Sequence, residues 1–160
     1  MKRLLLAAGL LGLSLVAQAG RYELVIDEGQ VRFADGVCPA LTVNGQSPAP
    51  ALRFQEGEEV EIAVTNQLDR MTALHWHGII LPYTQDGVPG ISFPGIQPGE
   101  TFTYRFTLNQ SGTYWYHAHA DFQEQEGIYG PLIVEPKKRE PYRYDREYTV
   151  LLFDWQDEKP

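Results

Sequence analysis

The feature that most constrains the fold of this 160-residue chain is its two-residue alternation of apolar and polar side chains. The segment "EVEIAVTN" (59–66) places Val60, Ile62 and Val64 on one face, and "TFTYRFTL" (101–108) has the same pattern with larger side chains. Alternate residues of a strand share a face, whereas an amphipathic helix repeats its apolar positions every three to four residues. The alternation therefore predicts β-strands.

Turn sequences separate these segments. The further segments "RYELVID", "PLIVE" and "EYTVLLF" are rich in β-branched and aromatic residues, which favour strands. Between the strands lie "ADG", "NGQSPAP", "QEGE", "DGVPG", "FPGIQPGE" and "QSG", all typical of turns. Short strands joined by turns, without helices between them, predict an antiparallel sandwich or barrel rather than βαβ units.

The N-terminus has the three parts of a secretory signal peptide. Lys2 and Arg3 precede the apolar run 4–16, and "AQA" at 17–19 matches a cleavage site. The run is too short for a membrane anchor, which needs about 20 apolar residues. We therefore expect residues 1–19 to be a signal peptide of the general secretory route. The mature protein would be periplasmic or secreted, without a membrane span.

Charge and cysteine content narrow the function further. The net charge is −8, and removal of the leader with its two basic residues would bring it to −10. An acidic chain without a Lys/Arg-rich tract disfavours nucleic acid as a partner. Cys38 is the single cysteine, so no internal disulfide can form, and packing or metal must hold the fold. We expect Cys38 to be a small buried apolar residue, rather than a reactive thiol or a metal ligand.

All four histidines occur in two H-x-H pairs. They are His75 and His77 in "LHWHG", and His117 and His119 in "GTYWYHAH". In a strand, residues i and i+2 point the same way, so each pair shares a face. The aromatic residues beside both pairs predict poorly hydrated surroundings for them. A metal ion would satisfy one ring nitrogen of each imidazole, although backbone carbonyls are an alternative partner. Imidazole suits zinc, copper, nickel and iron alike, so the spacing does not choose the metal.

Beyond these patterns, a long segment resembles a known family. "HWHGIILPYTQDGVPGISFPGIQPGETFTYRFTLNQSGTYWYHAHADFQEQEGIYGPLIVEP" is similar to the first cupredoxin domain of the multicopper oxidases, in particular the laccase-like, periplasmic copper-resistance (CopA) type. The similarity extends upstream through "NGQSPAPALRFQEGEEVEIAVTNQL" and downstream through "REYTVLLFDWQDEKP". It implies an all-β, Greek-key β-sandwich of the cupredoxin type over residues 20–136. Residues 137–160 would be a linker and the first strand of a second, truncated cupredoxin domain.

The resemblance also implies roles for individual residues. His75 would bind the type 2 copper, and His77, His117 and His119 would bind the pair of type 3 coppers. Asp86, in "QDGVPG", stands where the family has a carboxylate beside the cluster that assists proton delivery. The alternative for Asp86 is an ordinary turn residue before glycine.

The implied activity is oxidation of cuprous ion or a phenolic donor coupled to reduction of dioxygen to water, with a role in copper resistance or homeostasis. The family also uses a type 1 copper site and further histidines, for which this chain has no residues, so the chain alone is expected to be inactive. The missing C-terminal cupredoxin domain would come from a longer chain or from another subunit. The alternatives are a stand-alone periplasmic copper- or zinc-sequestering module and a purely structural sandwich. We interpret the polar segment "DFQEQEG" (121–127) as a solvated loop rather than a rim over the cluster.

Overall fold

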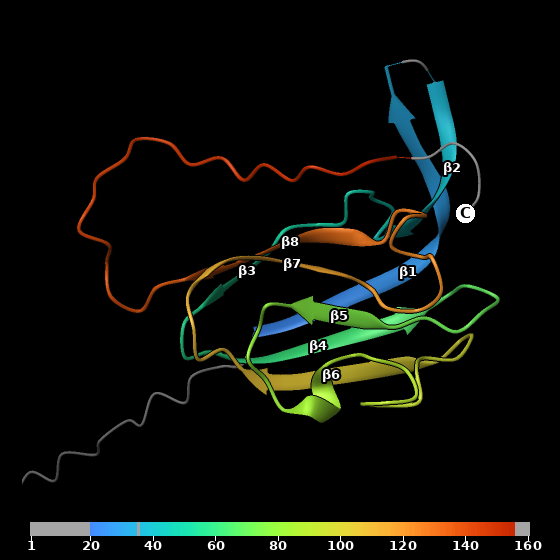
Figure 1. The fold of residues 1–160 in the computed structure, drawn as a ribbon, viewed down its shortest axis with the longest axis horizontal. Coiled ribbons are helices and arrows are strands. Elements are labelled where there is room, and N and C mark those ends of the chain that lie inside the picture. Colours follow the sequence, from blue (N-terminus) through green and yellow to red (C-terminus); the bar gives the residue numbers. More distant parts are fainter. Residues whose placement is uncertain (1–19, 35, 156–160) are drawn as a thin grey trace, which may run out of the picture.

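Two four-stranded sheets pack face to face in the computed structural model, which describes residues 20–34 and 36–155 (Figure 1). The signal peptide expected at 1–19 lies outside the described residues. The one helical element in the described residues is the 3-10 turn η1, and no helix there is long and apolar enough to cross a lipid bilayer. One sheet has the order β2-β1-β4-β6 and the other β3-β8-β7-β5. The elements are β1 (Gly20–Phe33), β2 (Gly36–Val43), β3 (Leu52–Gln55), β4 (Glu59–Asn66), β5 (Leu74–His77), η1 (Tyr83–Gln85), β6 (Thr101–Thr107), β7 (Gly112–Ala118) and β8 (Tyr129–Glu135).

The β-sandwich prediction is confirmed, but the expectation of purely antiparallel sheets is wrong. Strand β1 runs parallel to β4, and β3 runs parallel to β8. Alternation of side chains reports which residues share a face and carries no information on strand direction. A parallel pair needs a crossover connection, and between β1 and β4 the strands β2 and β3 make it in place of a helix.

The core lies between the sheets and is centred on Trp76 of β5. The faces predicted from alternation are buried: Ile62 and Val64 of β4 have no exposed surface, and Tyr104 of β6 has none. The Trp76 ring is also fully buried, 5.1 Å from the Tyr104 ring and 5.9 Å from the Tyr116 ring. Because Trp76 points into the core, its two neighbours on β5 must project from the opposite face of the sheet.

A long two-stranded arm extends from the first sheet. Residues 20–26 of β1 pair with β4, whereas residues 26–33 pair with β2, so residues 27–33 and β2 form a ribbon of two strands. Cys38 lies opposite Val31 on this arm and is half-buried rather than buried as predicted. The position on the arm explains the difference, because side chains there have fewer neighbours to cover them.

Residues 136–155 leave β8, run out in a wide loop and return toward the β1–β2 arm (Figure 1). None of these residues forms a strand, so the strand expected from "EYTVLLF" is absent from the described residues. Alternation is still visible, because Phe153 stacks on Tyr129 at 3.8 Å while Val150 and Leu152 are exposed. The assignment of this segment to a second domain stays a prediction.

Candidate metal centre

The four histidines come together on the outer face of the sheet at β5 and β7. His75 and His117 are direct cross-strand partners, His77 lies opposite Trp115, and His119 directly follows the end of β7. The ring centre of His75 lies 5.6 Å from that of His77, 5.4 Å from that of His117 and 5.5 Å from that of His119. The two H-x-H pairs therefore form one cluster around His75, because β5 and β7 are neighbours.

The cluster is open to solvent on one side. His117 is 6% exposed and His75 is half-buried, whereas His77 and His119 are exposed. The expectation that both pairs are poorly hydrated is therefore wrong for one member of each pair. The cause is position: β5 is the edge strand of its sheet, and His119 lies beyond the last residue of β7. The indole of Trp115 covers part of the cluster by stacking on His77 at 4.9 Å and on His117 at 4.2 Å.

His75 and His117 are both held through their Nδ1 atoms. Nδ1 of His75 lies 2.7 Å from the backbone oxygen of Asp86 and 3.3 Å from its carboxylate. Nδ1 of His117 lies 2.8 Å from the backbone oxygen of Ala118 and 2.7 Å from the carboxylate of Glu124. Carbonyl and ionised carboxylate oxygens only accept hydrogen bonds, so Nδ1 of each histidine must carry the proton. Nε2 of His75 and of His117 is therefore left with its lone pair, as a metal ligand requires.

His77 faces its neighbour His117 with Nδ1, the ring nitrogen that is occupied in His75 and His117. Nδ1 of His77 lies 3.2 Å from Nε2 of His117. One nitrogen each of His75, His77 and His117 all lie within 4.8 Å of one another. Two imidazole nitrogens bound to one ion at about 2.0–2.1 Å are roughly 3–4 Å apart, a spacing that the 3.2 Å between His77 and His117 matches. The donor set therefore fits a transition metal ion, and nitrogen ligands of this kind suit copper and zinc equally. His119 borders this three-nitrogen group without belonging to it.

Asp86 is both a turn residue and a neighbour of the cluster. It follows η1, and its N–H donates to the carbonyl of Tyr83 at 3.1 Å. The next residue, Gly87, has a φ of +75°, and a Cβ there would lie 1.7 Å from the carbonyl oxygen of Leu74. Only glycine allows the loop to approach β5 this closely. The "DG" sequence therefore brings the Asp86 carboxylate to His75, and the two interpretations of Asp86 are compatible.

The loop at 121–127 is part of the site, so its interpretation as a solvated loop is wrong. Gln123 is fully buried; its amide donates to the carbonyl of Met71 at 2.8 Å and accepts from the Thr72 hydroxyl at 2.6 Å. These bonds fix the loop against the chain that enters β5, and the next residue, Glu124, reaches His117. Sequence reasoning missed Glu124, and its one available signal was its place in the loop that follows the second histidine pair.

Burial sets the protonation of the central imidazole. The pKa of His117 is lowered to about 4, chiefly by desolvation and to a lesser extent by the three other imidazoles, while the Ala118 carbonyl opposes the shift. Burial also raises the pKa of the Glu124 carboxyl, against the opposing influence of His77 and His119. His117 is consequently neutral at ordinary pH, which is the form that binds metal ions.

The metal-free protein should lose stability as the pH falls from 6.5 toward 4. The unfolded chain binds a proton at His117 near pH 6.5, whereas the folded chain does so only near pH 4, so acid favours unfolding. A depression of this size corresponds to about 3 kcal/mol of unfolding free energy. Urea unfolding at several pH values measures it, and the variant His117→Gln is the control. An equal loss of stability in that variant would show that other groups cause the acid sensitivity.

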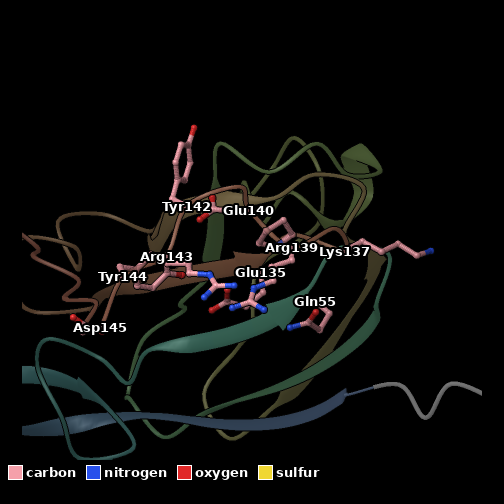
Figure 2. Close-up of a pocket in the computed structure, with 10 residues that line it drawn as sticks. Gln55, Glu135, Lys137, Arg139, Glu140, Tyr142, Arg143, Tyr144 and Asp145 are labelled. Atoms are coloured by element: carbon pink, nitrogen blue, oxygen red, sulfur yellow. The ribbon is translucent and has the colours of Figure 1, made fainter.

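A pocket elsewhere in the molecule is unrelated to the histidines. It encloses about 650 Å³ and is lined by Gln55, Glu135 and residues of the segment 136–145 (Figure 2). Figure 2 shows Tyr142 and Lys137 pointing outward from it. Its lining mixes acidic and basic side chains and contains no histidine. Among the described residues, the group of three side chains that could hold a metal ion lies at β5 and β7.

Comparison with known proteins identifies the family. The family model described as multicopper oxidase matches residues 25–139, which is most of the chain. The chain belongs to the multicopper oxidase family. Its members are oxidoreductases, and membership implies copper as the cofactor. The histidine cluster and the sandwich that carries it are thus features of a multicopper oxidase domain.

Several relatives of this multicopper oxidase domain are known. A copper resistance protein A homolog of Pseudomonas syringae pv. tomato is 52% identical over 87% of this chain and 24% of that protein. An L-ascorbate oxidase of Cucumis sativus is 45% identical over 72% of this chain and 20% of that protein. A crystal structure of a multi-copper oxidase from Pseudomonas thermotolerans is 37% identical, with a TM-score of 0.75 over 80% of this chain and 32% of that one. The chain spans about a quarter of the length of the curated relatives it matches.

Proposed function

We propose that this chain supplies half of the histidine ligands of the copper cluster at which a multicopper oxidase reduces dioxygen to water. The electron donor would be cuprous ion or a phenol, and the physiological role copper resistance or homeostasis. The observation that carries the proposal is the group of three imidazole nitrogens, from His75, His77 and His117, within 4.8 Å on adjacent strands. Family membership and the copper resistance relatives support copper as the ion.

Within this proposal the histidines have separate roles. His77 and His117 would bind type 3 copper, and their 3.2 Å contact supports a shared ion. His119 would bind type 3 copper as well, completing its coordination with ligands from the other half of the site. His75, whose Nδ1 faces Asp86, would bind the type 2 copper.

When bound, clustered copper supplies redox centres that together deliver the four electrons needed to convert dioxygen to water. The chain's own residues hold and orient the ligands. Asp86 fixes the ring of His75 and, with a side chain 37% exposed, lies between the cluster and solvent. This position suits a carboxylate that passes protons to the reaction site. Unchanged oxygen turnover on introducing Asp86→Asn into a longer protein that also contains the other half of the site would remove that role.

The proposal also includes location and partners. We infer export by the general secretory route, followed by removal of residues 1–19, so that the mature protein is periplasmic or secreted. The remaining ligands and the type 1 copper would come from a C-terminal cupredoxin domain, in the same longer chain or in another subunit. The open side of the cluster, where His77 and His119 are exposed, is suited to receive those ligands.

A second candidate function is metal sequestration without catalysis. It is favoured by the three-nitrogen group, which is complete within this single chain. Three histidines with one open position are a sufficient ligand set for zinc, and imidazole suits copper as well. A periplasmic copper- or zinc-binding module would need nothing more from a partner domain.

Copper loading and oxygen consumption distinguish the two functions. The chain alone should bind copper incompletely and consume no oxygen with cuprous ion or a phenol as donor. A longer protein that also contains a downstream His-Cys-His segment should bind several coppers, show the electron paramagnetic resonance of type 1 and type 2 copper, and consume oxygen. Fixed, tight metal binding by the chain alone, with no oxygen consumption by the longer protein, would establish sequestration instead.

A further inference from the structure

The carboxylate of Glu124 makes the shortest side-chain contact at the histidine cluster. Its Oε2 lies 2.7 Å from Nδ1 of His117, and its side chain is 25% exposed. His117 is the most buried of the four histidines, and its Nε2 lies 3.2 Å from Nδ1 of His77. A group that fixes the ring of His117 therefore fixes the centre of the site.

The loop that carries Glu124 is anchored independently of the histidines. Gln123, the preceding residue, is buried and bonded to the carbonyl of Met71 and the hydroxyl of Thr72. Glu126 forms an ion pair with Arg70 on the same entering segment. The carboxylate of Glu124 thus extends from a loop that is fixed on both sides.

The contact has a counterpart across the strands. His75, the cross-strand partner of His117, also faces a backbone carbonyl and a carboxylate through Nδ1, in that case both from Asp86. For His117 the carbonyl comes from Ala118 and the carboxylate from Glu124, a separate segment. A carboxylate faces Nδ1 in both of these cross-strand partners. This repeated arrangement indicates that each carboxylate orients the imidazole ring that it contacts.

We propose that Glu124 is a positioning residue that holds His117 in the tautomer with the proton on Nδ1 and the lone pair on Nε2. The inference rests on the proposed function of His117 as a metal ligand. An acceptor at Nδ1 excludes the tautomer that would place a proton on the ligand nitrogen. A carboxylate in this position also increases the basicity of the ligating nitrogen, and partners of this kind are worth about 10–100-fold in metal affinity.

The test begins with the metal-free protein. Long-range ¹H–¹⁵N correlation spectra at pH 7 report the tautomer of each histidine, and His117 should be protonated at Nδ1. In Glu124→Ala a measurable fraction should shift to the Nε2-protonated form, because the Ala118 carbonyl is then the sole acceptor. Glu124→Gln should restore most of the original population, since the amide oxygen still accepts. Asp121→Asn, which removes an exposed carboxylate from the same loop, is the matched control.

Copper affinity is then measured on the same four proteins by chelator competition. Glu124→Ala should raise the dissociation constant for copper about 10–100-fold, and Asp121→Asn should leave it unchanged. An unchanged His117 tautomer in Glu124→Ala would overturn the positioning role, whatever the copper affinity. A tautomer shift in a protein that binds no copper at all would support the positioning role and refute the proposed function.

Discussion

Replacing His117 with alanine is expected to lower the copper affinity of the protein by more than 100-fold. The variant loses one imidazole of the three-nitrogen group. This imidazole is the one whose Nε2 lies 3.2 Å from Nδ1 of His77. Loss of a residue that only supports a ligand costs about 10–100-fold, so loss of the ligand itself should exceed that range. Chelator competition at pH 7 measures the effect, because His117 is neutral there in the folded protein.

The matched comparison is His119→Ala, which removes an imidazole from the same cluster. Because His119 lies outside the three-nitrogen group, its loss should lower the affinity of this chain by about 10-fold or less. Urea unfolding of both variants without metal checks that the sandwich remains intact. Equal losses of affinity in the two variants would contradict the assignment of His117 as the central ligand, and unchanged affinity in both would place the metal elsewhere.

Strand geometry is local, so the sequence predicts which histidines share a face of their own strand. A two-residue repeat fixes His75 and His77 on one face of β5, and the same rule fixes His117 and His119. The two-residue repeat does not predict which strands are neighbours. The pairing of His75 with His117 results from the β5–β7 register, and the family resemblance, not the alternation, was the information that brought these strands together.

The errors of the sequence interpretation have a common physical origin. Strand direction, the exposure of His77 at a sheet edge and the burial of Gln123 all depend on contacts between segments distant in sequence. Polar composition made 121–127 look like a solvated loop, yet the hydrogen bonds of Gln123 to Met71 and Thr72 offset the cost of burying its amide. Buried polar side chains with distant partners are not recognisable from local composition.

The second large effect is expected at Trp76, where the core and the histidine cluster meet. Trp76→Ala should lower the free energy of unfolding of the metal-free protein by about 3–5 kcal/mol. Its ring is fully buried and contacts those of Tyr104, Phe106 and Tyr116, so truncation leaves a cavity between the two sheets. Urea unfolding at pH 7 measures the change as a lower midpoint.

Trp76→Phe is the control that separates ring packing from the polar atom. The indole Nε1 is buried and has no hydrogen-bond partner within the part of the chain that the structure describes. Phenylalanine keeps much of the packing and removes that unsatisfied N–H, so it should cost only about 1–2 kcal/mol. Since β5 is a four-residue edge strand, its position depends on this anchor, and Trp76→Ala should also weaken copper binding although Trp76 points away from the metal site. A Trp76→Ala protein as stable as Trp76→Phe, with unchanged copper affinity, would show that backbone pairing with β7 alone positions His75 and His77.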